Sequence, residues 1–451
     1  MQRARIIPVS GISNDKEAEQ RAASALLAVL TVVRDLSNEL LSPLGASKAA
    51  RATVESFTEV AFKLGSKTVR PDGLIRVTFA KSTWTALVEF KTGTAKLNAD
   101  QINDYWDVAR DQKFNHVITI SNELSPVPGQ HPTEKLRVQS RSPVQVTHYS
   151  WTAILTSAIK IKQHRGVEDP EQAWILEELI RYLEHPSSGA LAFNDMGPGW
   201  TATRDKARLG TLTPKDPEST EFAGNFEQLA QYAALLLGSK VGEDVDVIYP
   251  RNQKDATSRM KGIIASVCEF GTASTELKIP DTAGPLTLTA DLRASQIHAQ
   301  TTIAAPADRG AKARNTWLVT QLVIAPGSLR VDAYCKNARQ PQSCSLEVLR
   351  EDRGANIADM KNPPTKYRLT QSIPMGQGRK AGGKSPGFID STLQAIADFY
   401  STVLQDITEW HPKAPRIEER PAPSPPTSLP AVEEPSLYER YWTIDREPPG
   451  M

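Results

Sequence analysis

Alternating apolar residues divide the first half of the chain into strands and helices. Two β-prone runs, residues 74–79 and 84–90, lie on either side of a short connection and predict a β-hairpin. Helical spacing over residues 15–41 predicts an amphipathic helix that packs on the following domain, with binding of a partner as the alternative. Further elements are expected nearby: helices over 45–64, over 97–112, from 151 and over 170–183, and strands at 117–120 and 144–149.

Three charged residues lie at the ends of the predicted hairpin. Pairing around the connection sets Asp72, at the foot of the first strand, opposite the end of the second strand, where Glu89 and Lys91 lie. Because side chains alternate between the two faces of a strand, Glu89 and Lys91 point the same way, and the apolar residues beside them point to the opposite face. We therefore expect these three side chains to converge at one edge of a sheet.

The two carboxylates of this group suit a divalent cation. Carboxylates held close together repel each other and resist ionisation unless a cation lies between them. Asp72 and Glu89 offer hard oxygen ligands, with no cysteine or histidine close by in sequence, which favours Mg2+ or Mn2+ over Zn2+. Such an ion polarises a phosphoryl oxygen and lowers the pKa of bound water, and Lys91 would orient that water or offset charge in the transition state. The chemistry indicated is metal-assisted hydrolysis of a phosphodiester.

The same residues resemble the motifs of the PD-(D/E)xK nuclease superfamily, in the RecB-like branch whose motif helix carries Gln-x-x-x-Tyr. Pro71 and Asp72 match the first motif, residues 89–91 match Glu-x-Lys, and Gln101 and Tyr105 match the third motif. The resemblance implies a restriction-endonuclease-like α/β core with the element order αβββαβ and a mixed sheet. It also implies a supporting role for Gln101 and Tyr105 beside the substrate.

The resemblance further implies that a glutamate from the first helix joins the metal shell. Glu55 and Glu59 are four residues apart and would share one face of the helix predicted over 45–64. Glu59 is preferred, because it lies nearer the helix end that runs toward Asp72. The expected metal ligands are therefore Asp72, Glu89 and Glu59, with Glu55 as the alternative to Glu59.

The function expected from this site is metal-dependent hydrolysis of nucleic acid, with DNA favoured over RNA, in restriction, repair or defence. The alternative is a nucleic-acid-binding or regulatory protein that keeps a nuclease-like fold without catalysis, since a fold alone does not guarantee chemistry. The seven histidines show no paired spacing, and no nucleophile, histidine and acid arrangement can be assembled. A hydrolase of the serine or cysteine kind is therefore disfavoured.

The second half of the chain differs in character. Helices are predicted over 221–237 and 389–410, and strands are predicted at 261–268, 286–294, 316–324, 329–334 and 345–349. The expected organisation is an N-terminal helical extension over 1–44, a nuclease-like domain over 45–188, a separate α+β or mostly β domain of unknown role over 200–410, and a Pro-rich tail over 411–451.

Two further motif matches lack the context that their chemistry needs. Residues 378–385, GRKAGGKS, satisfy the phosphate-binding pattern G-x-x-x-x-G-K-[ST], but Pro386 and Gly387 follow where a helix should begin, so a flexible basic loop is expected. A second Glu-x-Lys, at residues 276–278, lacks an upstream aspartate in hairpin register and is interpreted as a solvated strand edge. Basic residues of two loops remain candidate contacts to a nucleic-acid backbone: Arg379, Lys380, Lys384, Arg309, Lys312 and Arg314.

Composition narrows the partners and the location. The 53 basic and 52 acidic residues nearly balance, so nucleic acid must be bound by a local patch. The three cysteines have no metal-ligand spacing, which suits a cytoplasmic location, and no apolar run is long enough for a membrane span, so no membrane partner is expected. The Pro-rich tail is expected to be disordered, with its late aromatic residues as a candidate docking motif for a protein partner. The oligomeric state is not indicated.

Overall fold

The structure is a computed structural model that describes residues 5–12, 14–125, 130–138 and 142–411. Met1–Trp410 form one compact unit. The Pro-rich tail predicted over 411–451 lies outside the described residues except for His411, so its predicted disorder and docking motif stay predictions. No helix of the described part is long and apolar enough to cross a membrane.

The first part of the chain contains a five-stranded sheet with the strand order β1-β4-β5-β6-β7. Its strands are β1 (Thr53–Thr58), β4 (Gly73–Phe79), β5 (Ser82–Phe90), β6 (His116–Ser121) and β7 (Gln145–Ser150). Pairing is antiparallel from β1 through β4 to β5 and parallel from β5 through β6 to β7, so the sheet is mixed. A small separate hairpin, β2 (Phe62–Leu64) with β3 (Lys67–Val69), precedes β4.

The helices of this part lie between and around those strands. They are α1 (Asp15–Val32), α2 (Arg34–Leu41), the 3-10 helix η1 (Ser42–Leu44), α3 (Ala99–Asp111), α4 (Trp151–Lys160), the π-helix η2 (Ile161–Arg165), α5 (Pro170–Leu183) and the 3-10 helix η3 (Pro186–Ser188). The predicted hairpin, the helix over 97–112, both later strands and the helices from 151 and 170 are confirmed. Asp169 caps α5, because its carboxylate accepts hydrogen bonds from the backbone N–H groups of Glu171 and Gln172.

The helix predicted over 45–64 is wrong. Residues 53–58 form the edge strand β1, and Val54 pairs with Val77 of β4. Glu55 and Glu59 therefore do not share a helical face, although their spacing suggested one. Pairing with β4 and packing against α1 outweighed the weak local helical pattern, which is the usual outcome where propensity and tertiary contacts conflict.

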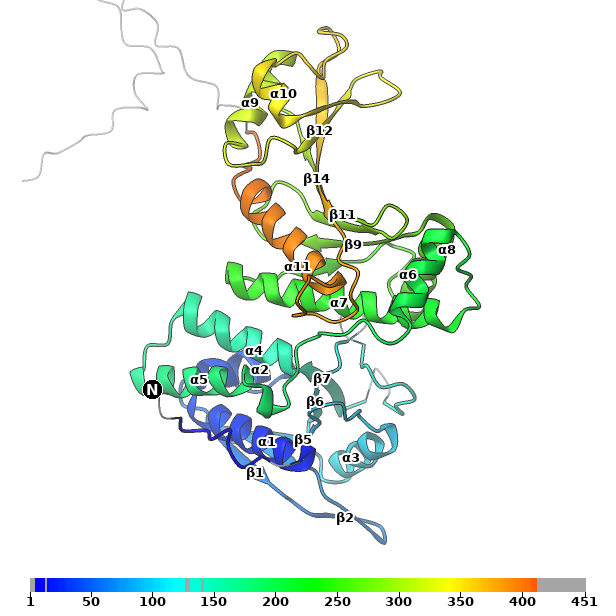
Figure 1. The fold of residues 1–451 in the computed structure, drawn as a ribbon. Helices are drawn as coiled ribbons and strands as arrows, with labels where there is room; N and C mark the ends of the chain where they lie inside the picture. The colour runs from blue at the N-terminus through cyan, green and yellow to red at the C-terminus, as the bar shows by residue number, and fades with distance from the viewer. Residues whose placement is uncertain (1–4, 13, 126–129, 139–141, 412–451) are drawn as a thin grey trace, which may run out of the picture. The chain divides into compact units, whose positions relative to one another are not determined.

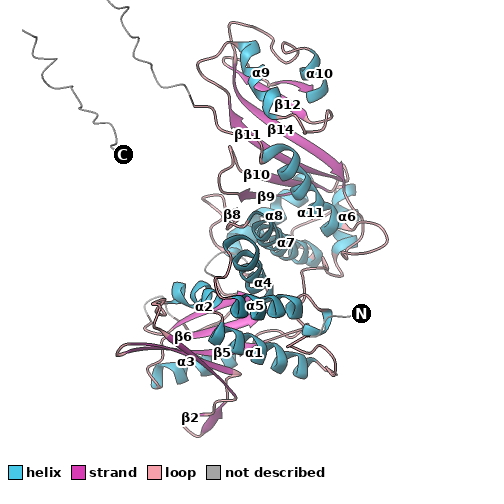
Figure 2. Cartoon of the chain, turned by 90° about the vertical axis from the view of Figure 1, so that its left-hand side faces the viewer, coloured by secondary structure: helices cyan, strands magenta, loops and turns pink. Residues whose placement is uncertain are grey.

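Helices cover both faces of the first sheet (Figures 1 and 2). On one face, α1, α2, α4 and α5 share a hydrophobic cluster with Val88, Phe90 and Ile118. On the other face, α3 packs with Leu87 and Val117. The segment predicted as an N-terminal extension thus supplies core helices of this layer, and α1 is the helix that precedes the three antiparallel strands.

The second part of the chain contains a seven-stranded sheet with the order β13-β12-β14-β11-β10-β9-β8, in which each pair is antiparallel. Its strands are β8 (Asp246–Ile248), β9 (Thr272–Lys278), β10 (Leu286–Asp291), β11 (Gln296–Ala304), β12 (Arg330–Cys335), β13 (Gln342–Ser345) and β14 (Pro364–Pro374). The helices are α6 (Trp200–Leu209), α7 (Pro217–Val241), α8 (Ala256–Phe270), α9 (Ala311–Gln321), α10 (Leu346–Glu351), α11 (Phe388–Phe399) and the π-helix η4 (Tyr400–Leu404).

Three strands predicted for this part are wrong, although its α+β character is confirmed. Residues 261–268 lie in α8, most of 316–324 lies in α9, and 345–349 enter α10. In α8 the buried residues Ile263 and Val267 are one helical turn apart, and the Asp255 carboxylate caps the first turn. β-prone residues in these runs concealed the helical period.

Candidate active site at the edge of the first sheet

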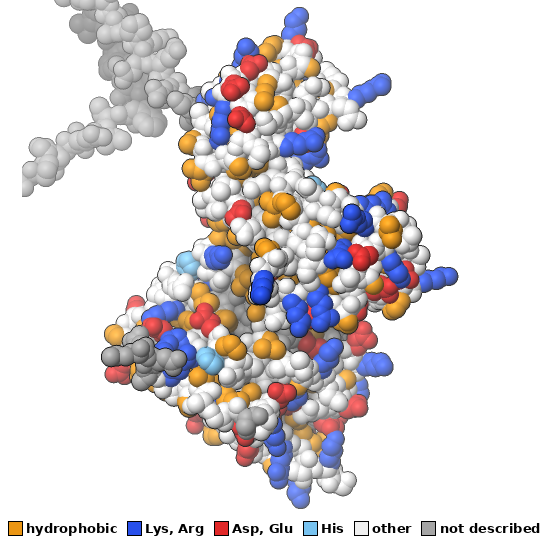
Figure 3. Space-filling view, viewed as in Figure 1, with side chains coloured by type: hydrophobic (Ala, Val, Ile, Leu, Met, Phe, Trp, Pro, Cys, Tyr) orange, Lys and Arg blue, Asp and Glu red, His pale blue; other side chains and the backbone are white. Residues whose placement is uncertain are grey.

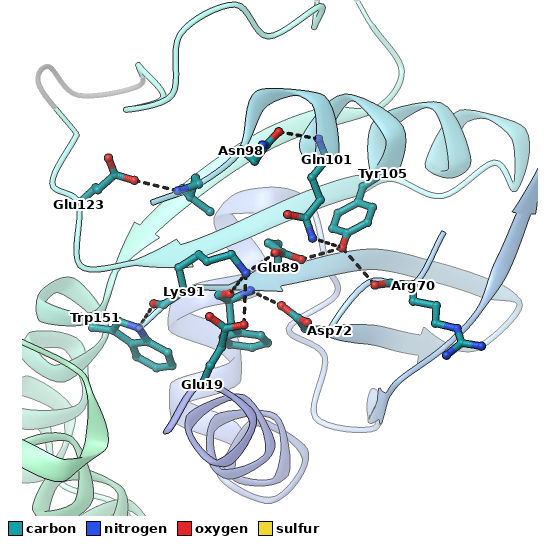
Figure 4. Close-up of polar contacts among 12 residues, drawn as sticks. Glu19, Arg70, Asp72, Glu89, Lys91, Asn98, Gln101, Tyr105, Glu123 and Trp151 are labelled. Carbon is teal, nitrogen blue, oxygen red and sulfur yellow. Dashed lines mark hydrogen bonds and ion pairs between the residues drawn. The ribbon is translucent and has the colours of Figure 1, made fainter. Parts of the chain in front are cut away.

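The hairpin of β4 and β5 brings Asp72 to the end of β5. Gly73 pairs with Val88, and the backbone N–H of Phe90 donates a hydrogen bond of 2.8 Å to the Asp72 carboxylate (Figure 4). On the next residue, the backbone N–H of Lys91 donates to the Ile120 carbonyl of β6 at 2.8 Å. The sheet therefore positions the backbone of all three charged residues that the sequence singled out.

Glu89 is the most deeply buried of these residues, with its side chain 1% exposed. Its Oε1 lies 2.6 Å from the Lys91 ammonium, and its Oε2 accepts a hydrogen bond of 2.8 Å from the Tyr105 hydroxyl. The contact of Oε1 with Lys91 is an ion pair without hydrogen-bond alignment, so this buried oxygen lacks an aligned donor among the described residues. This oxygen could bind a metal ion if the Lys91 ammonium moved away from it.

Burial raises the pKa of Glu89 to about 7, and the nearby charge of Asp72 adds to the effect, whereas Lys91 opposes it. Burial works against the charge of Lys91, but attraction by Glu89, Glu19 and Asp72 outweighs it, so the pKa of Lys91 is raised. Lys91 thus stays protonated and supplies the positive charge that lets the carboxylates ionise close together.

Gln101 and Tyr105, from one face of α3, continue the network around Glu89 (Figure 4). The Asn98 side chain caps the helix, and the Gln101 side-chain amide donates a hydrogen bond of 2.7 Å to the Tyr105 hydroxyl. Burial raises the pKa of Tyr105, and the neighbouring Glu89 carboxylate adds to it, so the hydroxyl keeps its proton. The hydroxyl also lies 3.1 Å from the Arg70 carbonyl. These contacts hold one oxygen of Glu89 in place.

Glu19 of α1 is a site residue that the sequence prediction missed. Its carboxylate lies 3.2 Å from the Lys91 ammonium and is 21% exposed. Burial raises its pKa, against the opposing effect of Lys91. A signal was present: Glu19 precedes the buried Ala23 by four residues and Leu26 by seven, which places a carboxylate on the apolar face of the helix.

A cavity of about 520 Å³ opens beside these carboxylates. Its lining includes the carboxylates of Glu19, Glu59 and Asp72 and the cations of Lys16 and Arg70. Glu59 lies just after β1 with a positive φ of 54°, so it borders the site from a turn and not from a helix. Its role as a metal ligand stays a prediction.

Glu55, the predicted alternative to Glu59, points elsewhere. It lies on β1, is exposed, and its carboxylate is 4.0 Å from the Arg76 guanidinium of β4. Glu55 does not line the cavity.

The donor set fits a hard divalent cation in its chemistry. Asp72, Glu89 and Glu19 present carboxylate oxygens, and the buried Oε1 of Glu89 lacks an aligned donor. The Lys91 ammonium lies between two of these carboxylates, Glu89 and Glu19. Among the described residues, no group of three or more His, Cys, Asp or Glu side chains is arranged to hold a metal ion. Binding of an ion would require Lys91 to move away from at least one of its two carboxylate partners.

Two histidines that the sequence analysis did not pair, His131 and His148, both contact the hydroxyl of Thr119. Thr119 lies on β6 and pairs with Glu89 of β5. The Thr119 hydroxyl lies 2.8 Å from His131 Nε2 and 3.0 Å from His148 Nδ1. The Thr133 N–H donates to His131 Nδ1, and His148 Nε2 lies 2.7 Å from the Glu123 carbonyl. The Thr133 N–H assigns a neutral form to His131, and burial lowers the pKa of both rings to about 4.

The basic candidates around α9 are only partly available for binding. Arg314 is buried, and its guanidinium donates to the carbonyls of Ala307, Arg309 and Pro364, so its predicted contact with nucleic acid is wrong. The guanidinium of Arg309 stacks on the Trp410 ring at 4.0 Å. The second Glu-x-Lys lies on β9, where Leu277 between its charged residues is buried.

Comparison with protein-family models, with curated proteins and with solved structures found no match to this chain. The site is therefore interpreted from its own geometry.

Proposed function

We propose that this protein is a metal-dependent nuclease that hydrolyses phosphodiester bonds, with DNA as the first candidate substrate. The observation that carries the proposal is the convergence of Asp72, Glu89 and Lys91 at one sheet edge, with Glu19 from α1 beside them. Carboxylates and an ammonium placed together suit phosphoryl transfer, which needs charge stabilisation and an oriented water more than a covalent nucleophile.

The element order supports a restriction-endonuclease-like core for this part of the chain. Helices α1 and α2 and the short η1 are followed by the antiparallel strands β1, β4 and β5, then by α3 and the parallel strand β6. This is the order αβββαβ that the resemblance implies, if α1, α2 and η1 together count as the first helix and the small hairpin β2–β3 is counted as an insertion. The resemblance to the PD-(D/E)xK superfamily remains part of the proposal.

Asp72, which lines the cavity, and Glu89, which is buried beside it, would hold the ion, with Glu19 and Glu59 as the further carboxylates that line the cavity. A Mg2+ or Mn2+ ion in this place would polarise the scissile phosphate and lower the pKa of a bound water. Tyr105, supported by Gln101, fixes one oxygen of Glu89 by its hydrogen bond. The protonated Lys91 offsets negative charge on the phosphate and orients the attacking water.

Two cations support binding of the substrate. Lys16 and Arg70 line the cavity next to the carboxylates, and both are exposed. Their charges can hold the phosphates on either side of the scissile bond, where carboxylates alone would repel the backbone. A role in restriction, repair or defence, and a cytoplasmic location, which the free thiols of the three cysteines suit, belong to the same proposal.

One observation favours a second function, that of a non-catalytic nucleic-acid-binding or regulatory protein with a nuclease-like fold. Lys91 contacts both Glu89 and Glu19, so its ammonium offsets part of the carboxylate charge without an ion. A protein that had lost catalysis would also retain such a buried network for stability. The two functions differ in whether cleavage requires the ion and these residues.

The test is a cleavage assay with the purified full chain in Mg2+ or Mn2+, on single-stranded, duplex and branched DNA and on RNA. Asp72→Asn and Lys91→Met should each remove cleavage, and a chelator should remove it reversibly. Asp104→Asn is the matched control, because Asp104 forms only a surface ion pair with Lys67 away from the cavity. Absence of cleavage on every substrate, or cleavage that survives Asp72→Asn and Lys91→Met, would overturn the nuclease proposal.

A further inference from the structure

The loop over residues 377–385, whose sequence matches a phosphate-binding motif, is built differently from a nucleotide site. Helix α11 begins at Phe388, after the Lys384–Ser385 step has passed. The Asp390 carboxylate accepts hydrogen bonds from the N–H groups of Gly382 at 3.1 Å and Gly387 at 2.8 Å. These backbone N–H groups, which could otherwise bind a phosphate, thus donate to a carboxylate, and the negative charge of that carboxylate would repel a phosphate.

The loop is held in one conformation by its own backbone. The Phe388 N–H donates to the Gly378 carbonyl at 2.8 Å, and Gly378 also bridges to Gly387. A Cβ on Gly387 would lie 2.3 Å from the Lys380 carbonyl oxygen, so only glycine fits this closure. The flexible loop expected from the sequence is therefore a closed, hydrogen-bonded one.

The same loop is hydrogen-bonded to residues 194–200, which connect the first part of the chain to the second. The Met196 N–H donates to the Arg379 carbonyl and the Ala381 N–H donates to the Asn194 carbonyl, both at 2.9 Å. The Trp200 indole N–H donates to the Gln377 carbonyl at 2.9 Å. These bonds fix the base of the loop and leave its side chains outside.

The side chains that the loop presents are cationic. Lys380 and Lys384 are exposed, and neither forms an ion pair within the described ranges. Arg379 is half-buried and lies 3.4 Å from the Asp195 carboxylate. Figure 3 shows Lys and Arg side chains gathered where this loop lies beside α7 in Figure 1. Cations on a fixed backbone lose less entropy on binding an anion than cations on a mobile loop.

Hydrogen bonds connect this loop to the candidate active site. The Gly93 N–H, two residues after Lys91, donates to the Gly189 carbonyl at 2.9 Å, and the Asn122 side-chain amide donates to both Gly93 and Gly189 carbonyls. From Gly189 to Asn194 the chain can span at most about 18 Å. This upper limit for the segment corresponds to about five phosphates along one strand of a nucleic acid, at 3.4 Å each, and the steps from Lys91 to Gly93 and from Asn194 to the loop add to it.

We propose that the loop over residues 377–385 binds the phosphodiester backbone of DNA, through Lys380 and Lys384, and holds the strand whose scissile bond lies at the Asp72–Glu89 site. The inference rests on the proposed nuclease function and assigns binding of the DNA backbone to this loop. The loop is a contact for a polymer backbone and not a site for a free nucleotide.

The test measures DNA binding and not cleavage. The full chain with Asp72→Asn, which blocks cleavage, is titrated with a fluorescent strand of about 30 nucleotides and with its duplex, at several salt concentrations. The loop pair Lys380→Gln and Lys384→Gln is compared with the control pair Lys336→Gln and Lys361→Gln, which removes the same charge from exposed lysines outside the loop. Thermal unfolding checks that both pairs fold as the parent does.

We expect the loop pair to weaken binding by about 10-fold or more, and to reduce the slope of log K against log salt by about 1.4 for the strand and 1.8 for the duplex. The control pair should leave both quantities near the parent values. Equal effects of the two pairs, or no binding of DNA by the parent, would overturn the inference. ATP binding that is lost in Lys384→Gln would also overturn it, in favour of a nucleotide site.

Failure of the two proposals can be told apart. A chain that cleaves nothing, but binds DNA through Lys380 and Lys384, would refute the nuclease and keep the backbone contact. If the chain that carries Lys380→Gln and Lys384→Gln cleaves DNA as fast as the chain with both lysines, the backbone contact is refuted and the nuclease proposal stands.

Discussion

At the scale of single residues, the site depends on how the charge of Glu89 is stabilised. A buried carboxylate is costly unless hydrogen bonds and an opposite charge surround it. Here Lys91 lies at Oε1, and the Tyr105 hydroxyl lies at Oε2. The sequence predicted all three residues, because the strand alternation and the Gln-x-x-x-Tyr spacing are local patterns. It did not reveal that Glu89 would be almost fully buried.

Tyr105→Phe is expected to destabilise the protein by about 1 to 3 kcal/mol, since it leaves Glu89 Oε2 without its donor in a buried place. Cleavage should fall by about 10-fold or more, because Glu89 loses its fixed orientation. Urea unfolding and the cleavage assay measure the two effects.

Tyr149→Phe is the matched control for that substitution. The Tyr149 hydroxyl donates to the Leu40 carbonyl at 2.6 Å, away from the cavity. It should cost stability without a specific loss of cleavage. If Tyr105→Phe and Tyr149→Phe reduce cleavage equally, Tyr105 has no role beyond folding.

At the scale of elements, the helix that supplies the extra carboxylate is α1 and not a helix over 45–64. Its apolar face and its packing on the following domain were predicted from the sequence, but its contact with Lys91 was not, because amphipathicity shows that one face is covered without showing which residues cover it. Glu19 lies on that covered face, one turn before Ala23. Contact between α1 and the end of β5 made it a neighbour of Lys91.

Glu19→Gln is expected to reduce cleavage by about 10- to 100-fold, since it removes a charge that contacts Lys91 and borders the proposed metal position. Glu59→Gln is the comparison, because Glu59 lines the same cavity from an exposed turn. Rates measured over a range of Mg2+ concentrations will separate loss of affinity for the ion from loss of turnover. A large effect of Glu59→Gln with none from Glu19→Gln would restore the ligand set predicted from the sequence.

At the scale of the whole molecule, the two sheets are joined through α4 and α7. The Thr156 hydroxyl donates to the Leu235 carbonyl, and the buried Lys160 pairs with Asp244 just beyond the end of α7. His164 Nε2 lies 3.0 Å from the Ser239 carbonyl. These contacts place basic side chains at the carboxyl end of α7, where the helix dipole favours them.

Acid is expected to destabilise the folded chain through His131 and His148. Burial lowers the pKa of both rings to about 4, below the ordinary value of 6.5, so the unfolded chain takes up protons first as the pH falls. The stability that depends on the neutral rings is complete above pH 6.5 and is lost progressively toward pH 4. The loss should reach about 2 to 3 kcal/mol per histidine.

Urea unfolding of the parent chain and of His148→Gln, from pH 7 to pH 4, tests this dependence. The variant should be less stable at pH 7 but should lose less stability on acidification. His298→Gln is the control, because among the described residues His298 of β11 has one hydrogen-bond partner, the Ser372 hydroxyl. A variant whose stability falls as steeply as that of the parent would show that another group controls the acid response.

In the second sheet, local sequence patterns predicted only some of the elements correctly. Its strands β10 and β12 were recognised, and residues 276–278 of β9 were placed at a strand edge. Strands β8, β11, β13 and β14 were not predicted, and three helices were taken for strands. A short apolar run is compatible with both elements, and only the neighbours decide. The buried ion pair of Arg259 with Glu227, which joins α8 to α7, has no signal in the sequence.

The sequence by itself determined the hairpin, its three charged residues and the helix that carries Gln101 and Tyr105, because each depends on a short period or on a turn. Tertiary structure decided which helix supplies the extra carboxylate, how deeply Glu89 is buried, that His131 and His148 meet at Thr119, and that the basic loop is closed on Asp390. The contacts of Glu19 with Lys91 and of both histidines with Thr119 join residues far apart in the chain. Their proximity comes from the burial of apolar faces against partners that no local pattern names.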